Sequence, residues 1–154
     1  MRKTLNLLVA AWLFAGLANA AAGVSDLAGE ATRLSNEGKQ EEAIAKFNEA
    51  IRLAPENASL YLNLGLVYQG MGRYADAVSS IEKAISLGER GVRTYATLAF
   101  GYEALAVSTQ PPLSPRPYWD KARDAWTKVL SLETDPGKQH MARKHIDRIE
   151  DITK

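Results

Sequence analysis

The sequence predicts an all-α fold in which three helix pairs stack into an α-solenoid and one more helix covers the last pair. Two observations support this fold class. Apolar residues recur at helical spacing along most of the chain, and the same residue types return after a fixed interval of 34 positions. A period of about 20–50 residues is typical of repeat architectures, in which neighbouring units bury each other's apolar faces.

The first 20 residues have the pattern of a secretory signal peptide. Two basic residues precede an apolar stretch over residues 5–17, and small residues follow it. The stretch is too short to cross a bilayer, because a spanning helix needs roughly 20 apolar residues. We therefore expect cleavage after Ala20 or Ala22 and a soluble periplasmic or secreted protein without an integral membrane span. The chain has no cysteine, so a lipid anchor on a cysteine is excluded.

Three rows of corresponding residues define the first half of each repeat. They are Leu27, Tyr61 and Tyr95, then Ala31, Gly65 and Ala99, and then Leu34, Tyr68 and Tyr102. Both steps within every row are 34 residues. The rows combine small and large side chains, as expected where two helices approach closely and fill the space around the contact.

Three further rows define the second half of each repeat and reveal an insertion. They are Ala43, Ala77 and Ala122, then Phe47, Ile81 and Trp126, and then Ala50, Ala84 and Val129. In each row the first step is 34 residues and the second is 45. The additional 11 residues therefore lie between Tyr102 and Ala122, an interval that holds four of the chain's six prolines.

The repeated unit resembles the tetratricopeptide repeat family, whose pattern is W-x2-L-G-x2-Y, then A-x3-F, then P. Residues 60–85 match best, with Tyr61 at the tryptophan position followed by Leu64, Gly65, Tyr68, Ala77, Ile81 and Ala84. The resemblance implies a right-handed solenoid with repeats at about 24–57, 58–91 and 92–134. Glu89 and Thr134 depart from the pattern, since a proline usually closes the repeat.

Apolar periodicity and end signals predict seven helices in a domain that spans residues 24–154. Their expected ranges are about 25–37, 40–53, 58–70, 74–86, 92–106, 118–132 and 136–152. The last of them is expected to cap the solenoid. Asp135 suits an N-cap, Pro136 suits the first helical position, and Ala142, Ile146 and Ile149 form its apolar stripe.

Composition and motifs predict no catalytic, metal or cofactor chemistry. Without Arg2 and Lys3 of the predicted signal peptide, 17 of the 19 basic residues remain, against 18 acidic residues. The two signs are interspersed, so the sequence predicts no basic surface for binding nucleic acid. His140 and His145 are five positions apart, whereas a helical zinc pair is four apart. No Ser–His–Asp set and no phosphate-binding glycine loop is present in the required context. We expect no enzyme, no metal, no cofactor and no nucleic-acid partner.

The resemblance implies that the first helix of each pair lines a concave groove that receives a partner's peptide or helix. By position, the groove candidates are Leu62, Asn63, Leu66, Gln69, Arg93, Phe100 and Glu103, together with Ser25, Ala28, Thr32 and Ser35 of the first repeat. Three of them, Leu62, Leu66 and Phe100, fall outside the packing rows and predict an apolar groove. The alternative is that neighbouring helices or the chain's own loop cover these three side chains.

Some members of the family clamp a partner's C-terminal carboxylate with five polar residues. Asn63 and Arg93 match that set, but Ala28, Thr32 and Thr97 do not. Recognition of that kind is therefore not expected here.

The proline-rich insertion at about 107–117 is a second candidate surface. Proline lacks an N–H and disfavours helix in the residue before it, so the insertion should end the fifth helix and form an extended, polyproline-like loop. Its candidate contact residues are Pro112, Pro115, Arg116 and Tyr118. The alternative is an inert or packed connection between two helices.

Together these features predict an exported adaptor or scaffold that binds one or more proteins in its groove, with a role in envelope assembly. The alternative is a structural homo-oligomer that associates through exposed faces of the solenoid.

Overall fold

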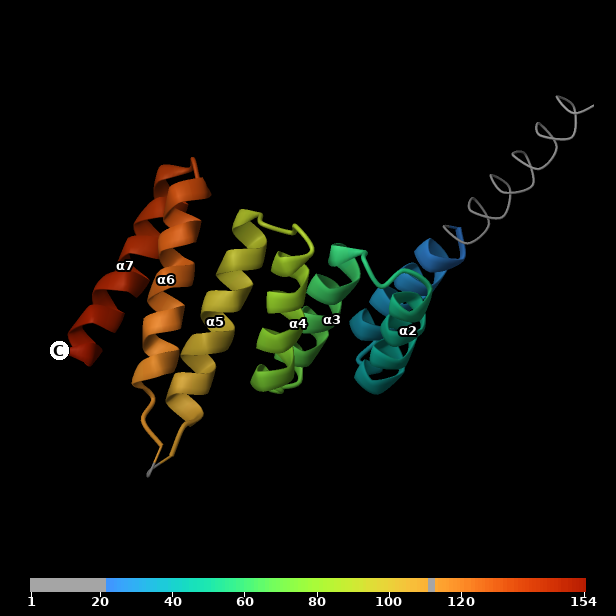
Figure 1. Ribbon diagram of the computed structural model, residues 1–154, viewed down its shortest axis with the longest axis horizontal. Helices are drawn as coiled ribbons and strands as arrows, with labels where there is room; N and C mark the ends of the chain where they lie inside the picture. The colour runs from blue at the N-terminus through green and yellow to red at the C-terminus, as the bar shows by residue number, and fades with distance from the viewer. Residues whose placement is uncertain (1–21, 111–112) are drawn as a thin grey trace, which may run out of the picture.

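The computed structural model describes residues 22–110 and 113–154, and within these ranges it contains seven helices and no strand (Figure 1). The first helix is described over residues 22–36. The others are α2 (Gln40–Leu53), α3 (Ala58–Gly70), α4 (Tyr74–Ser86), α5 (Val92–Ser108), α6 (Arg116–Leu132) and α7 (Pro136–Thr153). They form three stacked pairs and a capping helix, as predicted. The predicted signal peptide and its cleavage sites lie outside the described residues.

Local signals in the sequence determine several helix ends. Asn57 caps α3, where its side chain accepts a hydrogen bond from the backbone N–H of Ser59. Asp135 caps α7 in the same way through the N–H of Lys138, and a proline follows at the start of the helix. Gly38 and Gly72 adopt positive φ angles of 80° and 73° in the turns after the first helix and α3. Glycine adopts this conformation without steric cost, so both helices end there.

The predicted packing rows form the core of the solenoid. Every member of the rows that begin at Ala43 and Phe47 is buried, including Trp126 in the third repeat. Gly65 allows the closest helix approach, because a Cβ atom built on it would lie 2.6 Å from Ile81 Cγ1 and 3.2 Å from the carbonyl oxygen of Ala77. Small residues at these positions therefore set the distance between α3 and α4.

The insertion lengthens two helices as well as the loop between them. Ala106 occupies the position that Gly38 and Gly72 hold in the earlier repeats, and α5 continues through it to Ser108. The helix α6 begins at Arg116, so the connection spans only residues 109–115. The predicted loop at 107–117 is thus shorter than expected. A proline near the start of α6 is tolerated because the first N–H groups of a helix have no intrahelical acceptor.

The lengthened hairpin is packed against the preceding repeat. Tyr118 stacks on Tyr102 with ring centroids 6.4 Å apart, and the ammonium group of Lys121 lies 5.1 Å from the Tyr102 ring. Burial raises the pKa of the Tyr102 hydroxyl, which stays protonated and donates a hydrogen bond to Glu82 of α4. Tyr118 therefore belongs to α6, within the helix predicted at about 118–132, and its ring packs on Tyr102.

Substitution of Gly65 by alanine tests the close contact between α3 and α4. We expect Gly65→Ala to lower the free energy of unfolding by about 1–3 kcal/mol, because the new methyl group meets both Ile81 and backbone. Gly29→Ala is the matched control, since nothing lies within 4 Å of its Cβ position and the change should stabilise the first helix by about 0.5–1 kcal/mol. Urea denaturation compares the two; equal or greater stability of Gly65→Ala would contradict the packing.

Candidate functional site

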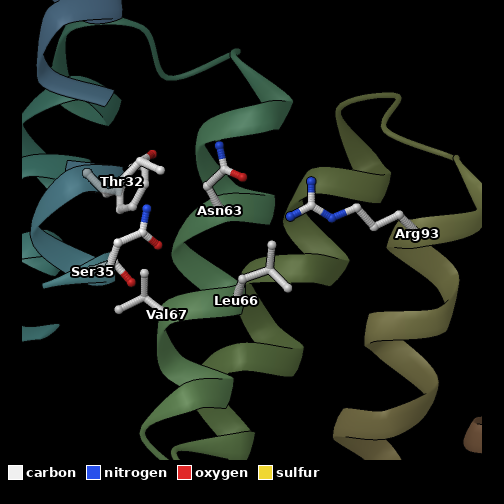
Figure 2. Close-up of a pocket in the computed structure, with 8 residues that line it drawn as sticks. Thr32, Ser35, Asn63, Leu66, Val67 and Arg93 are labelled. Atoms are coloured by element: carbon white, nitrogen blue, oxygen red, sulfur yellow. The ribbon is translucent and has the colours of Figure 1, made fainter. Parts of the chain in front are cut away.

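A polar pocket lies where the first helix, α2, α3 and α5 come together (Figure 2). Its cavity volume is about 190 Å³, and its lining residues are Thr32, Ser35, Asn36, Phe47, Asn63, Leu66, Val67 and Arg93. Asn63, Leu66 and Arg93 were predicted as groove residues from sequence, as were Thr32 and Ser35. The fold brings these five together because the first helices of successive pairs stand side by side.

Among the described residues, Arg93 is the only charged one that lines this pocket. Figure 2 shows its guanidinium group reaching from α5 toward Leu66 and Asn63 on α3. In the ranges that the structure describes, no side-chain hydrogen bond or ion pair involves the side chains of Asn63 and Arg93. By contrast, the Thr32 hydroxyl donates to the carbonyl oxygen of Ala28 at 2.8 Å. Asn63 and Arg93 therefore offer N–H donors for a carboxylate or carbonyl oxygen.

Two of the other predicted groove residues on α3 lie elsewhere. Leu62 is only 7% exposed and packs with Val78 and Leu98 in the core, so its predicted position in the groove is wrong. The reason is that α4 and α5 both pack against this face of α3. Gln69 is half-buried in the last turn of α3 and does not line the polar pocket.

A second, larger hollow lies between α5 and α7 and contains two further groove candidates, Phe100 and Glu103, whereas Ser25 and Ala28 line neither hollow. Its volume is about 580 Å³, and its other lining residues are Tyr74, Ala104, Val107, Ser108, Trp119, Arg148 and Ile152. Most of this lining is apolar. We call this hollow the α5–α7 trough.

Glu103 is buried beside the trough and joins three helices. Its Oε1 atom accepts a hydrogen bond from the Trp126 Nε1–H at 2.6 Å and lies 2.8 Å from His145 Nδ1. Its other oxygen pairs with Arg148. The predicted role of Glu103 as an open groove residue is therefore wrong, since α7 supplies partners for its carboxylate.

Aromatic packing surrounds the same carboxylate. The His145 ring stacks on Trp126 at a centroid distance of 4.3 Å, and Phe100 meets Trp126 edge-on at 4.9 Å. Phe100 also meets His145 edge-on at 5.4 Å. These contacts attach α7 to α5 and α6 and fix the side chains at the base of the trough.

The described residues that were predicted for the insertion loop lie in two different settings. Pro115 and Arg116 line a small hollow that adjoins the α5–α7 trough, because Trp119 and Ile152 line both. Arg116 is the first residue of α6 and so lies in a helix, which corrects its predicted place in the loop. Tyr118 is packed on Tyr102 as described above. Pro112 lies outside the described residues.

Sequence reasoning missed several residues that line the two hollows. They include Asn36, Phe47, Val107, Trp119, Arg148 and Ile152. One signal was available, since Arg148 and Ile152 are four positions apart and share a face of α7. The contribution of Trp119 depends on how far α6 extends toward its N-terminus, which the repeat pattern does not specify.

Across residues 22–110 and 113–154 no group of His, Asp or Glu side chains is arranged to hold a metal ion. In the same part of the chain, no helix combines the length and apolar character needed to cross a membrane.

Two family models match the chain, one for the TPR repeat over residues 34–72 and one for the tetratricopeptide repeat over residues 58–87. The chain therefore contains tetratricopeptide repeats, as its sequence pattern indicated. Together the two matches include all of α2, α3 and α4.

Curated relatives share these repeats over part of their length. Small glutamine-rich tetratricopeptide repeat-containing protein 2 of Saccharomyces cerevisiae is 32% identical over 103 residues, which is 67% of this chain and 27% of the relative. The Hsp70-Hsp90 organizing protein of Triticum aestivum is 35% identical over 68 residues, covering 44% of this chain and 12% of the relative. The chain thus spans about a quarter or less of these relatives.

Solved structures support the fold. The first tetratricopeptide repeat domain of Spaghetti (RPAP3), bound to the HSP90 peptide SRMEEVD, has a TM-score of 0.69 and 20% sequence identity. The match covers 84% of this chain and 92% of that domain.

Removal of the Glu103 carboxylate tests its role in holding α7. We expect Glu103→Ala to lower the free energy of unfolding by about 1–3 kcal/mol, because the Trp126 N–H and the facing groups of α7 lose a buried acceptor. Hydrogen exchange should show the amides of α7 losing protection first, since only two of its residues, Ala142 and Ile149, are fully buried.

The matched control for this change is Glu150→Ala, which removes an exposed carboxylate from α7 itself. Its effect should stay within about 0.5 kcal/mol. If both variants unfold at the same urea concentration, the buried network does not hold α7.

Proposed function

We propose that the protein is a non-catalytic adaptor that binds a segment of another protein on the surface formed by the first helix, α3 and α5. The observation that carries the proposal is the polar pocket, in which Asn63 and Arg93 present donors without partners among the described side chains. Further support comes from the structural neighbour that was solved with a peptide bound.

The chemistry of the pocket limits what its ligand presents. One guanidinium group suits a single acidic group, which Arg93 can bind through two parallel N–H donors. The apolar lining residues Phe47, Leu66 and Val67 lie beside it and suit an aliphatic portion of the same segment. Thr97 cannot add a contact, because it is buried and its hydroxyl donates to the carbonyl oxygen of Arg93. We therefore propose an extended partner segment with one acidic residue next to an apolar one.

Charge reversal in the pocket tests this function. The protein and its variants are crosslinked to their partners in the native source, and the captured proteins are quantified by mass spectrometry. Arg93→Glu should lower recovery of the main partner about tenfold, since it replaces attraction by repulsion at the acidic group, and Asn63→Ala should lower it less.

Arg90→Glu is the matched control, because Arg90 is exposed, precedes α5 and does not line the pocket. Circular dichroism establishes that the variants fold. Equal recovery by Arg93→Glu and Arg90→Glu would contradict binding at this pocket.

We further propose that the protein is exported and acts in envelope assembly. The support is the pattern of residues 1–20, with two basic residues, an apolar stretch too short for a bilayer and small residues at the expected cleavage point. An adaptor in that compartment would meet other exported proteins as its partners.

Export is tested by the mass of the protein recovered from a periplasmic or culture fraction of a bacterial host. We expect a chain that begins at residue 21 or 23, and we expect Leu8→Arg, which interrupts the apolar stretch, to leave the full-length chain in the cytosol. An uncleaved wild-type chain in the cytosol would contradict export. If all the crosslinked partners were cytosolic proteins, that result would contradict a role in envelope assembly.

A further inference from the structure

The walls of the α5–α7 trough carry an unpartnered apolar stripe. Seven large apolar side chains are exposed in the described residues, and four of them, Phe100, Val107, Met141 and Ile152, lie on α5 and α7. Phe100 and Val107 are seven positions apart, and Met141 and Ile152 are eleven apart. With about 3.6 residues per turn, each pair lies on one face of its helix. The exposed apolar side chains of these two helices therefore form one stripe on each, and Phe100, Val107 and Ile152 line the trough.

The two helices that carry these stripes are parallel and held in a fixed arrangement. Figure 1 shows α5 and α7 running in the same direction. Phe100 of α5 contacts the ring of His145 of α7, and both contact Trp126 behind them. The Glu103 carboxylate bonds to groups of both α6 and α7. The trough is therefore preformed and needs little reorganisation to accept a ligand.

The insertion builds one end of this trough. Val107, which is 71% exposed, and Ser108 belong to the turn by which α5 continues past the glycine position of the earlier repeats. Trp119 lies in the first turn of α6. The start of α6 lies further before Ala122 than the start of α4 lies before Ala77, which is the corresponding residue of the second repeat. The 11 additional residues thus lengthen α5 and α6 where both line one end of the trough.

The charges left available around the trough are cationic. Both oxygens of Glu103 are occupied by Trp126, His145 and Arg148. Arg148 is 53% exposed, and its Nε and Nη1 donors take part in no hydrogen bond among the described residues. Arg116 lines the adjoining hollow and takes part in none of the ion pairs found in residues 22–110 and 113–154. The rim therefore attracts acidic groups to an apolar floor.

We propose that the α5–α7 trough binds an amphipathic helix of a partner protein, with an apolar stripe that enters the trough and acidic residues that flank it. A groove between two neighbouring helices accepts the side-chain ridge of a third helix. The acidic flanks meet Arg116 and Arg148, and the apolar stripe covers Phe100, Val107 and Ile152. The inference rests on the proposed role in protein binding but assigns it a surface separate from the polar pocket.

The probe is a pool of fluorescein-labelled peptides of about 18 residues, a length at which helices begin to form in water. Leucines stand at i, i+3, i+4 and i+7 spacing, and the other positions draw on Asp, Glu, Gln and Ser. A matched pool replaces Asp and Glu by Lys and Arg. Anisotropy with the full chain should show the acidic pool binding about tenfold more tightly than the basic pool, and no binding of the acidic pool would overturn the inference.

Variants locate the binding surface. Val107→Asp and Ile152→Asp each place a carboxylate on an exposed wall position, so the fold should persist while affinity for the acidic pool falls about tenfold. Arg116→Glu should reduce the preference for acidic over basic peptides. Leu53→Asp is the matched control, because Leu53 is a comparably exposed apolar residue on α2 outside the trough. Equal binding by Val107→Asp, Ile152→Asp and wild type would overturn the inference.

Two further measurements separate this inference from its alternatives. Arg93→Glu tests whether the acidic peptides bind in the polar pocket instead, and a loss of binding in Arg93→Glu but not in Val107→Asp would place them there and overturn the inference. Sedimentation of the full chain without peptide tests whether a second copy occupies the trough. A dimer that Val107→Asp converts to a monomer would overturn the proposed partner helix in favour of self-association.

Discussion

The close contact of a glycine with a large apolar side chain on the neighbouring helix is the constraint on which the spacing of α3, α4 and α5 depends. Gly65 leaves no room for a side chain against Ile81, and Gly101 is equally close to Val78 of the preceding helix, where a Cβ would lie 2.8 Å from Cγ2. These contacts fix how near α3 lies to α4 and α4 to α5. Because neither glycine has a Cβ atom, the helices can approach this closely. Adding a single carbon atom at Gly65 or Gly101 would change the spacing between neighbouring helices.

The same stacking produces both candidate surfaces. Regular spacing brings the first helix, α3 and α5 together, so that Asn63 and Arg93, which are far apart in sequence, share one pocket. Beyond the third pair, α7 packs on α6 and brings its own polar groups to Glu103. The buried carboxylate is stabilised there because each oxygen has a donor, and within the described residues no buried side-chain polar atom lacks a hydrogen bond.

The insertion shows how a repeat protein gains a surface without losing its fold. Ala122, Trp126 and Val129 are buried like the corresponding residues of the first two repeats. The additional residues extend α5 and α6 beyond the contact between these two helices and do not displace it. The exposed side chains that result lie at one edge of the solenoid, next to α7. The most irregular part of the sequence thus lies beside the larger of the two candidate binding surfaces.

The sequence by itself determined the helices, the repeat, the position of the insertion and the buried rows. These features follow from local helix propensity and from a period that is visible in all three repeats. The sequence did not determine which groove residues are covered. Leu62 and Leu66 are four positions apart on one helix, yet only Leu62 is covered by α4 and α5. Glu103 likewise became a buried network residue because α7, 42 positions along the chain at His145, reaches it. Burial at these sites depends on which helices become neighbours, and only the tertiary structure decides that.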